Sequence, residues 1–210
     1  MKTTAVATAV ATALLAALTA ANPIEVRQTG GCKAFTLLFA RGTTEMGTLG
    51  SVVGPGLQRD VQAALGADKV DVVGVAYPAD MGGIMSEATG SGPGSVAMAN
   101  QANQALTKCP QTKLILTGYS QGGMVVHNAG KKLSGKAVAA AVTFGDPFKG
   151  QGVTGVPAGK FKSFCAAGDT VCSAGGCASS GGCGSASGAG HIGYGSDTKS
   201  AAAFIKTAVA

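Results

Sequence analysis

The sequence contains no tryptophan, few other aromatic residues and few charges. Of its 210 residues, 5% are aromatic and 12% are charged, and the net charge is +6. Apart from the pair Lys131-Lys132, the basic residues are dispersed, and no arginine-rich run is present to follow a phosphate backbone. We therefore expect no nucleic-acid partner.

A long apolar run of the kind that spans a membrane is also missing. The chain begins with a short uncharged stretch rich in alanine and threonine, which suits a secretory signal better than a membrane anchor. Residues 1–21 are the predicted signal peptide, with Thr19 and Ala21 as small residues before the cleavage site, and residues 22–27 are interpreted as a short propeptide. Residues 28–210 are then long enough for one secreted domain and too few for two of ordinary size.

Cysteine is present, but the Cys-x-x-Cys spacing of common metal sites is absent. All six cysteines follow the predicted signal: Cys32, Cys109, Cys165, Cys172, Cys177 and Cys183. An even number in an exported protein predicts disulfides, for which fifteen pairings are possible in principle. A metal bound by the closely spaced Cys172, Cys177 and Cys183 is the less favoured alternative.

Short apolar runs rich in β-branched residues alternate with helical patterns along the chain. The expected strands are Phe35–Ala40, Val70–Tyr77, Lys113–Gly118, Ala137–Phe144 and Phe161–Ala166. The expected helices are Ser51–Leu65, Ser95–Cys109, Gly122–Leu133 and Ser200–Val209. This alternation predicts a three-layer α/β/α sandwich with a central, mainly parallel five-stranded sheet. The Gly- and Ser-rich segments Pro78–Gly94 and Ser173–Gly190 are expected to be irregular and to flank the edge where ligands bind such sheets.

The pentapeptide Gly118-Tyr119-Ser120-Gln121-Gly122 follows an expected strand and opens an expected helix. In that context a Gly-x-Ser-x-Gly pattern forms a nucleophile elbow, a tight turn in which a Cβ at either glycine would collide with neighbouring backbone. Because the chain contains 34 glycines, the pattern alone is moderate support, and its position between strand and helix strengthens it. Ser120 is therefore the candidate nucleophile.

A serine nucleophile needs a base, and the chain has two histidines. His127 lies two helical turns beyond Ser120 on the same expected helix, so it points away and is interpreted as a helix-surface or packing residue. His191 follows the last expected strand and is the candidate base. Of the two acids between Ser120 and His191, Asp169 is favoured for orienting the imidazole, and Asp146, which precedes a proline and suits a turn, is the alternative.

A negatively charged oxygen that develops on a substrate needs hydrogen-bond donors. The backbone N–H of Gln121, the residue after the candidate nucleophile, is one expected donor. The second is expected from the loop after the first strand, where Thr43 offers both an N–H and a hydroxyl.

Taken together, these motifs resemble the cutinase family of secreted serine esterases. The matching pieces, in the family's order, are Ala40-Arg41-Gly42-Thr43-Thr44-Glu45, Gly118-Tyr119-Ser120-Gln121-Gly122, Gly168-Asp169-x-Val171-Cys172 and His191-x-x-Tyr194. The resemblance implies a minimal α/β-hydrolase without a large lid, with Ser120, Asp169 and His191 as triad and Thr43 with Gln121 as oxyanion hole. It also implies a monomer with the disulfides Cys32–Cys109 and Cys165–Cys172.

The stretch between Asp169 and His191 departs from the family pattern. It is longer and richer in Gly and Ser than expected, and it carries an extra pair, Cys177 and Cys183, which we expect to be bridged to each other. The loops that flank the expected crevice offer mainly the apolar side chains Met81, Ile84, Met85 and Ile192.

The predicted activity is hydrolysis of carboxylic esters, most of all cutin and short- to medium-chain acyl esters, without a cofactor. An acetylxylan esterase is the nearest alternative, because a polar rim would suit a polysaccharide. A non-catalytic secreted binding or effector protein is the alternative from another class.

Overall fold

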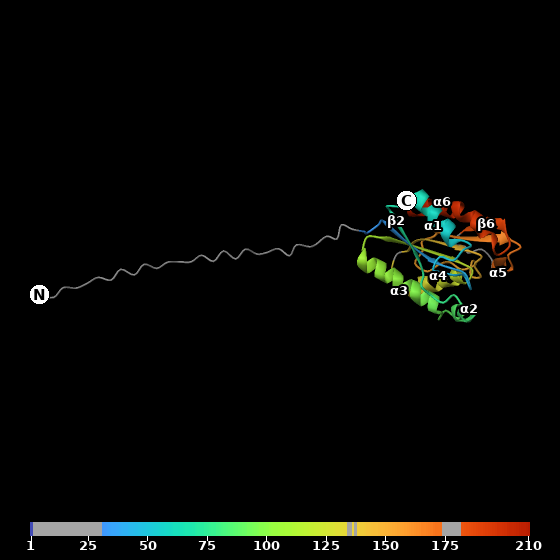
Figure 1. Ribbon diagram of the computed structural model, residues 1–210, viewed down its shortest axis with the longest axis horizontal. Coiled ribbons are helices and arrows are strands. Elements are labelled where there is room, and N and C mark those ends of the chain that lie inside the picture. Colours follow the sequence, from blue (N-terminus) through green and yellow to red (C-terminus); the bar gives the residue numbers. More distant parts are fainter. Residues whose placement is uncertain (2–30, 134–135, 137, 174–181) are drawn as a thin grey trace. The chain divides into compact units, whose positions relative to one another are not determined.

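A six-stranded parallel sheet forms the centre of residues 32–210 (Figure 1). The computed structural model describes residues 1, 31–133, 136, 138–173 and 182–210. The sheet order is β2-β1-β3-β4-β5-β6, and every neighbouring pair is parallel. The strands are β1 (Phe35–Ala40), β2 (Val70–Gly74), β3 (Lys113–Tyr119), β4 (Val138–Phe144), β5 (Phe161–Ala167) and β6 (Gly182–Ala189).

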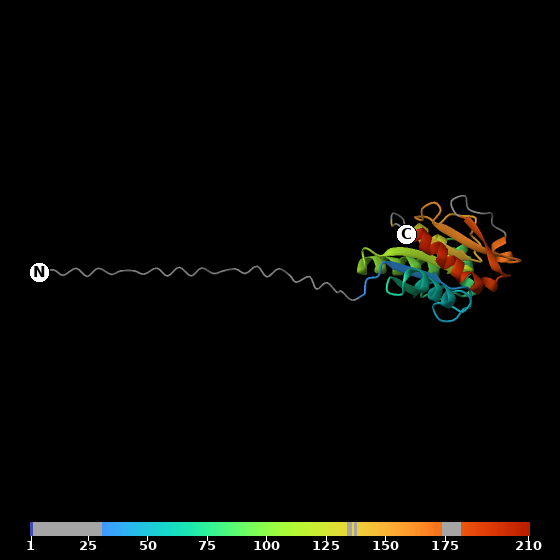
Figure 2. The same cartoon turned by 90° about the horizontal axis from the view of Figure 1, so that it is seen from above.

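Helices cover both faces of the sheet. They are α1 (Gly54–Leu65), α2 (Met81–Ala88), α3 (Pro93–Lys108), α4 (Gln121–Lys132), α5 (Thr170–Ser173) and α6 (Thr198–Val209), with a short 3-10 turn, η1, at Gly193–Asp197. Helices α1 and α6 pack together on one face, above the sheet in Figure 1, and α3 and α4 pack together on the other. Figure 2 shows α1 and α6 from above. The predicted three-layer α/β/α sandwich is confirmed.

Strand β1 shows why the strands read as continuous apolar runs. Leu37 and Phe39 point into the core under α1 and α6, whereas Leu38 and Ala40 point into the core under α3 and α4. Because helices cover both faces of the sheet, these side chains are buried whichever face they point to. Burying one leucine fully contributes about 1.5–3 kcal/mol to the free energy of folding.

Two segments that were expected to be irregular contain regular structure. One of them adds a strand, so the prediction of five strands is wrong by one. The segment Ser173–Gly190 includes the edge strand β6, whose sequence Gly-Cys-Gly-Ser-Ala-Ser-Gly-Ala has no β-branched or large apolar residue to indicate a strand. The segment Pro78–Gly94 includes α2, where two glycines weaken the helical pattern. The side chain of Asp80 caps this helix by accepting a hydrogen bond from Gly83 N at 2.7 Å.

Among the described residues, one disulfide links segments far apart in the sequence and another links segments close together. Cys32–Cys109 joins the segment before β1 to the end of α3, and Cys165–Cys172 joins β5 to α5. The expected Cys177–Cys183 bridge includes Cys177, which lies outside the described residues, as do residues 2–30 with most of the predicted signal peptide and the propeptide. In the part of the chain that the structure describes, no helix is long and apolar enough to cross a bilayer.

Candidate active site

Ser120 occupies the turn between β3 and α4, at the edge where the strands' carboxyl ends meet. Its backbone has φ 57° and ψ −120°, a conformation that costs a non-glycine residue of the order of 1–3 kcal/mol. A Cβ on Gly118 would lie 2.0 Å from the Gly122 carbonyl oxygen, and a Cβ on Gly122 would lie 2.0 Å from that of Ala40. The two glycines are therefore steric requirements of the turn.

His191 bridges Ser120 and Asp169. Its Nε2 lies 2.8 Å from Ser120 Oγ, and its Nδ1 lies 2.9 Å from Asp169 Oδ2. With Nδ1–H donating to the carboxylate, Nε2 is left as the acceptor for the serine hydroxyl proton. The aspartate side chain is completely buried, whereas the histidine side chain is 29% exposed, so the acid is shielded and the base faces the open edge.

The carboxylate of Asp169 is held by a set of hydrogen bonds. Burial alone raises its pKa, but hydrogen bonds from the Tyr194 hydroxyl, His191 and the backbone N–H of Val171 outweigh that effect, so its pKa lies below the ordinary value. The group is therefore ionised at neutral pH, as an acid that orients a histidine must be. The Cys165–Cys172 disulfide encloses this loop.

Two tyrosines form hydrogen bonds that hold His191 and Asp169 in place. The Tyr194 hydroxyl accepts a hydrogen bond from Ala166 N at 2.9 Å while donating to Asp169, and burial raises its pKa. The Tyr119 hydroxyl donates to the His191 carbonyl oxygen at 2.8 Å, and burial raises the pKa of Tyr119 to about 12. The supporting role of Tyr119 was missed from the sequence, because the position between Gly118 and the serine carries no pattern that indicates such a contact.

The loop that carries Thr43 lies against the start of α4. Thr44, with φ 64°, donates its N–H to Ala79 O at 2.8 Å, and the carboxylate of Glu45 accepts the N–H of Gly42 at 2.7 Å. A Cβ on Gly122 would lie 2.0 Å from Ala40 O and 2.9 Å from Arg41 O, so the start of this loop packs against the first turn of α4. Thr43 and Gln121 as the pair of oxyanion donors stay a prediction.

The alternative acid, Asp146, belongs to a second carboxylate–imidazole pair. Its Oδ2 lies 2.8 Å from His127 Nε2 and accepts the Thr143 hydroxyl at 2.8 Å, and both the aspartate and the histidine are buried. His127 is thus a packing residue inside the molecule. The pair ties α4 to the turn after β4, and it does not include Ser120.

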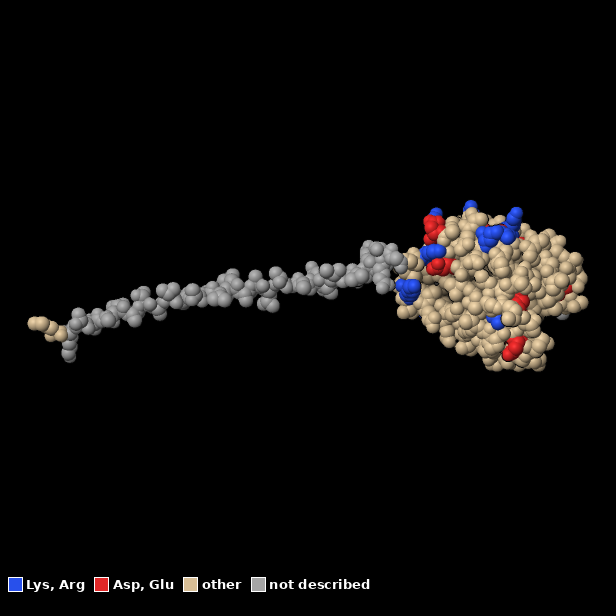
Figure 3. Space-filling view, in the orientation of Figure 1, with Lys and Arg blue, Asp and Glu red and all other residues tan. Residues whose placement is uncertain are grey.

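The face of residues 32–210 that Figure 3 shows carries few charged side chains, and these gather mainly at its upper left. Among the described residues, the large exposed apolar side chains include Met46, Met81, Met85 and Ile192. A pocket of about 600 Å³ opens between the loops that carry Met46 and Met81. Exposed apolar patches of this kind typically mark binding surfaces.

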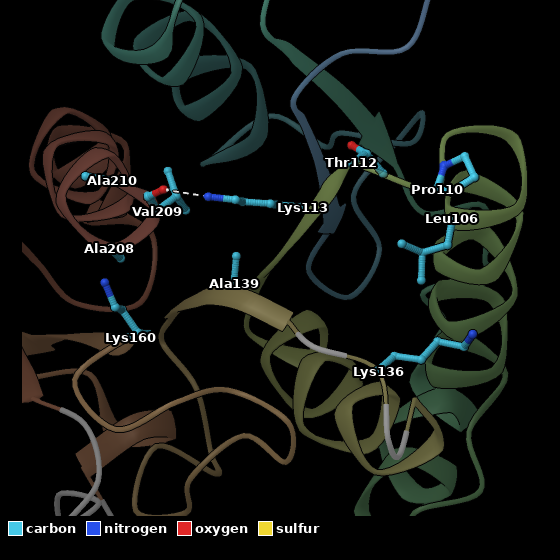
Figure 4. A pocket seen from close by; sticks show the side chains of 10 residues that line it. All are labelled: Leu106, Pro110, Thr112, Lys113, Lys136, Ala139, Lys160, Ala208, Val209 and Ala210. Carbon is cyan, nitrogen blue, oxygen red and sulfur yellow. Dashed lines mark hydrogen bonds between the residues drawn. The ribbon is translucent and has the colours of Figure 1, made fainter.

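Another pocket, of about 550 Å³, lies at the opposite edge of the sheet (Figure 4). Its lining includes Leu106, Lys113, Ala139 and Val209, and Lys113 Nζ donates to Val209 O at 3.4 Å. Lys113 and Ala139 stand at the amino ends of β3 and β4, whereas Ser120 follows the carboxyl end of β3. We therefore assign this pocket no part in chemistry at the elbow.

The chain is similar to known proteins both in sequence and in structure. Residues 31–209 match the family model described as Cutinase. The chain is 45% identical to "Cutinase 4" of Emericella nidulans over 184 residues, which cover 88% of this chain and 75% of that one. A solved Trichoderma reesei cutinase in complex with a phosphonate inhibitor superposes with a TM-score of 0.69 at 37% identity, covering 85% of this chain and 78% of that one. A solved acetylxylan esterase superposes with a TM-score of 0.61 at 26% identity, covering 86% of this chain and 100% of that one.

Proposed function

The chain belongs to the cutinase family, and from that premise we propose that it is a secreted serine esterase whose nucleophile, base and acid are Ser120, His191 and Asp169. Carboxylic ester hydrolysis is the activity that its named relatives share with it. One observation carries the assignment of roles, namely the chain of hydrogen bonds from Asp169 through both ring nitrogens of His191 to Ser120.

In the acylation step, Ser120 Oγ attacks the ester carbonyl while His191 Nε2 takes the hydroxyl proton. Asp169 holds the imidazole in the required tautomer and stabilises the imidazolium. The developing oxyanion accepts hydrogen bonds from the backbone N–H of Gln121 and from Thr43. When the tetrahedral intermediate collapses, His191 returns the proton to the leaving alcohol, and an acyl-enzyme remains.

Water completes the cycle by the same route. His191 deprotonates a water molecule that attacks the acyl carbonyl, and the carboxylic acid leaves as Ser120 recovers its proton. Besides the ester and water, each step uses only groups of the protein itself, so the proposal requires no cofactor.

We propose apolar acyl esters, including those of cutin, as substrates. The exposed Met46, Met81, Met85 and Ile192 favour an apolar acyl chain or polyester over a polysaccharide. Removal of acetyl groups from polysaccharide is the second candidate, supported by the likeness to a solved acetylxylan esterase.

Export is part of the same proposal. Residues 1–21 are proposed as the signal peptide and residues 22–27 as a propeptide, so that the mature domain starts near residue 28. The disulfides Cys32–Cys109 and Cys165–Cys172 support an oxidising, extracellular location. We propose a monomer, as the family resemblance implies.

The test is hydrolysis of p-nitrophenyl esters from acetate to palmitate by the protein and by Ser120→Ala. The variant should lose on the order of a million-fold in kcat on every ester. Ser200→Ala, a change at an exposed position on α6, is the matched control and should keep full activity. Full activity in Ser120→Ala would refute the proposal, activity confined to acetate would favour the acetylxylan alternative, and inactivity of the unaltered protein would favour a binding protein.

A further inference from the structure

Apart from Met1, which the proposed signal peptide contains, the methionines of this chain divide into two groups by exposure. Met46, Met81 and Met85 are 85%, 67% and 69% exposed, whereas Met98 and Met124 are 0% and 4% exposed. We call the first three the methionine rim. An exposed thioether is open to oxidants, whereas a thioether packed in a core is protected. The buried Met98 and Met124 therefore serve as an internal reference for the oxidation of the exposed methionines.

The methionine rim lies beside the candidate oxyanion loop. Met46 follows that loop directly, and Met81 and Met85 stand one helical turn apart on α2. Helix α2 is tied to the elbow, because Gln121 Nε2 donates to Asp80 O at 2.8 Å. Met46 and Met81 also line one pocket of about 600 Å³. A change in the polarity of these side chains therefore changes the surface at the mouth of the site.

We propose that the methionine rim is a site of oxidative modification that controls which esters the enzyme accepts. A hydroperoxide is the oxidant: the thioether sulfur attacks one peroxide oxygen, the O–O bond breaks, and a sulfoxide forms while water or an alcohol leaves. The sulfur is oxidised by two electrons and the peroxide is reduced by two. The product is a polar, hydrogen-bonding group where an apolar one stood.

The consequence for substrates rests on the proposed function. A long acyl chain or a polyester surface has to cover the rim, and covering a sulfoxide with hydrocarbon leaves its oxygen without a hydrogen-bond partner. An acetyl group is too small to do so. Oxidation should therefore lower kcat/KM for palmitate about ten-fold or more and change that for acetate less than about two-fold.

The experiment treats the folded protein with dilute hydrogen peroxide and locates the added oxygen by peptide mass spectrometry. We expect Met46, Met81 and Met85 to be oxidised well before Met98 and Met124, with the palmitate-to-acetate ratio falling in step. Methionine sulfoxide reductases with a thiol reductant should restore the ratio. In the triple variant Met46→Leu/Met81→Leu/Met85→Leu, the ratio after treatment should equal the ratio before it, whatever the starting value.

A second readout does not depend on catalysis. Adsorption of Ser120→Ala protein to a polycaprolactone film should weaken after peroxide treatment, so failure of the proposed chemistry and failure of the rim proposal are distinguishable. Equal oxidation of the buried and exposed methionines would overturn the proposal. So would an unchanged ester ratio together with unchanged film adsorption when all three rim residues carry sulfoxides.

Discussion

The disulfide Cys32–Cys109 should matter more for stability, whereas the disulfide Cys165–Cys172 should matter more for activity. Cys32–Cys109 closes a separation of 77 residues, and Cys165–Cys172 closes one of 7 residues. The entropy that each crosslink removes from the unfolded chain corresponds to about 4.5 kcal/mol for the long loop and about 2.4 kcal/mol for the short one. The variant Cys32→Ala/Cys109→Ala should therefore lose about 2 kcal/mol more free energy of unfolding than Cys165→Ala/Cys172→Ala.

Activity should follow the reverse order, because the short bridge encloses Asp169. Without it, the turn from β5 into α5 depends on weaker restraints, such as the hydrogen bond from Asp169 N to Ala166 O at 3.1 Å. A displacement of the carboxylate by about 1 Å is expected to lower kcat on the order of a hundred-fold. The long bridge sits at the amino end of β1, at the edge opposite Ser120, so its removal should leave kcat at 25 °C nearly unchanged.

Urea unfolding followed by circular dichroism measures the first quantity, and p-nitrophenyl butyrate hydrolysis at 25 °C measures the second. Alanine is used at all four positions so that no buried hydroxyl is introduced at Cys172, which is fully buried. Each double variant serves as the control for the other. The reasoning is refuted if the short-bridge variant is the less stable of the two, or if the folded long-bridge variant loses ten-fold in kcat.

Three further changes test the geometry of the candidate site. Asp169→Asn should lower kcat about ten-thousand-fold at pH 8. Because the folded-state pKa of Asp169 is depressed, the ionised carboxylate contributes its full stability above a pH of about 4, the ordinary value for an aspartate, and loses it as the pH falls further. The difference in free energy of unfolding between variant and parent, measured in urea, should therefore be largest near pH 6 and shrink progressively below about pH 4. Gly122→Ala should yield little folded protein on a soluble-expression assay, since its Cβ would lie 2.0 Å from Ala40 O; normal yield and melting temperature would contradict the steric argument. Tyr194→Phe leaves the N–H of Ala166 without its acceptor, so it should lower the free energy of unfolding, measured by thermal unfolding, by about 1–3 kcal/mol. It should also reduce kcat without changing KM, because Asp169 loses a hydrogen bond; an unaltered kcat would show that the hydroxyl does not position the acid.

Much of the fold could be predicted from the sequence, because the signals are local. The apolar runs that became β1 and β3 are buried on both faces, and Gly118 is required by a contact within the strand-to-helix turn, with the carbonyl oxygen of Gly122. The contact that requires Gly122 comes from Ala40 on the neighbouring strand β1, but the Gly-x-Ser-x-Gly pattern that contains both glycines is local in sequence. Strand β6 could not be predicted, because its Gly-, Ser- and Ala-rich sequence has no side-chain pattern, and it pairs with β5 through backbone hydrogen bonds.

The candidate site likewise combines residues that the sequence could predict with a choice that it could not make. The sequence by itself determined that Ser120 stands in a tight turn between a strand and a helix, and it favoured His191 over His127 as the candidate base, since His127 lies two turns along the same helix. Only the tertiary structure decided between the two acids: Asp169 meets His191 across 22 residues of sequence, while Asp146 turns to His127. The physical reason is that backbone sterics act over a few neighbouring residues, whereas the choice of hydrogen-bond partner depends on which loops the assembled sheet brings to the same edge.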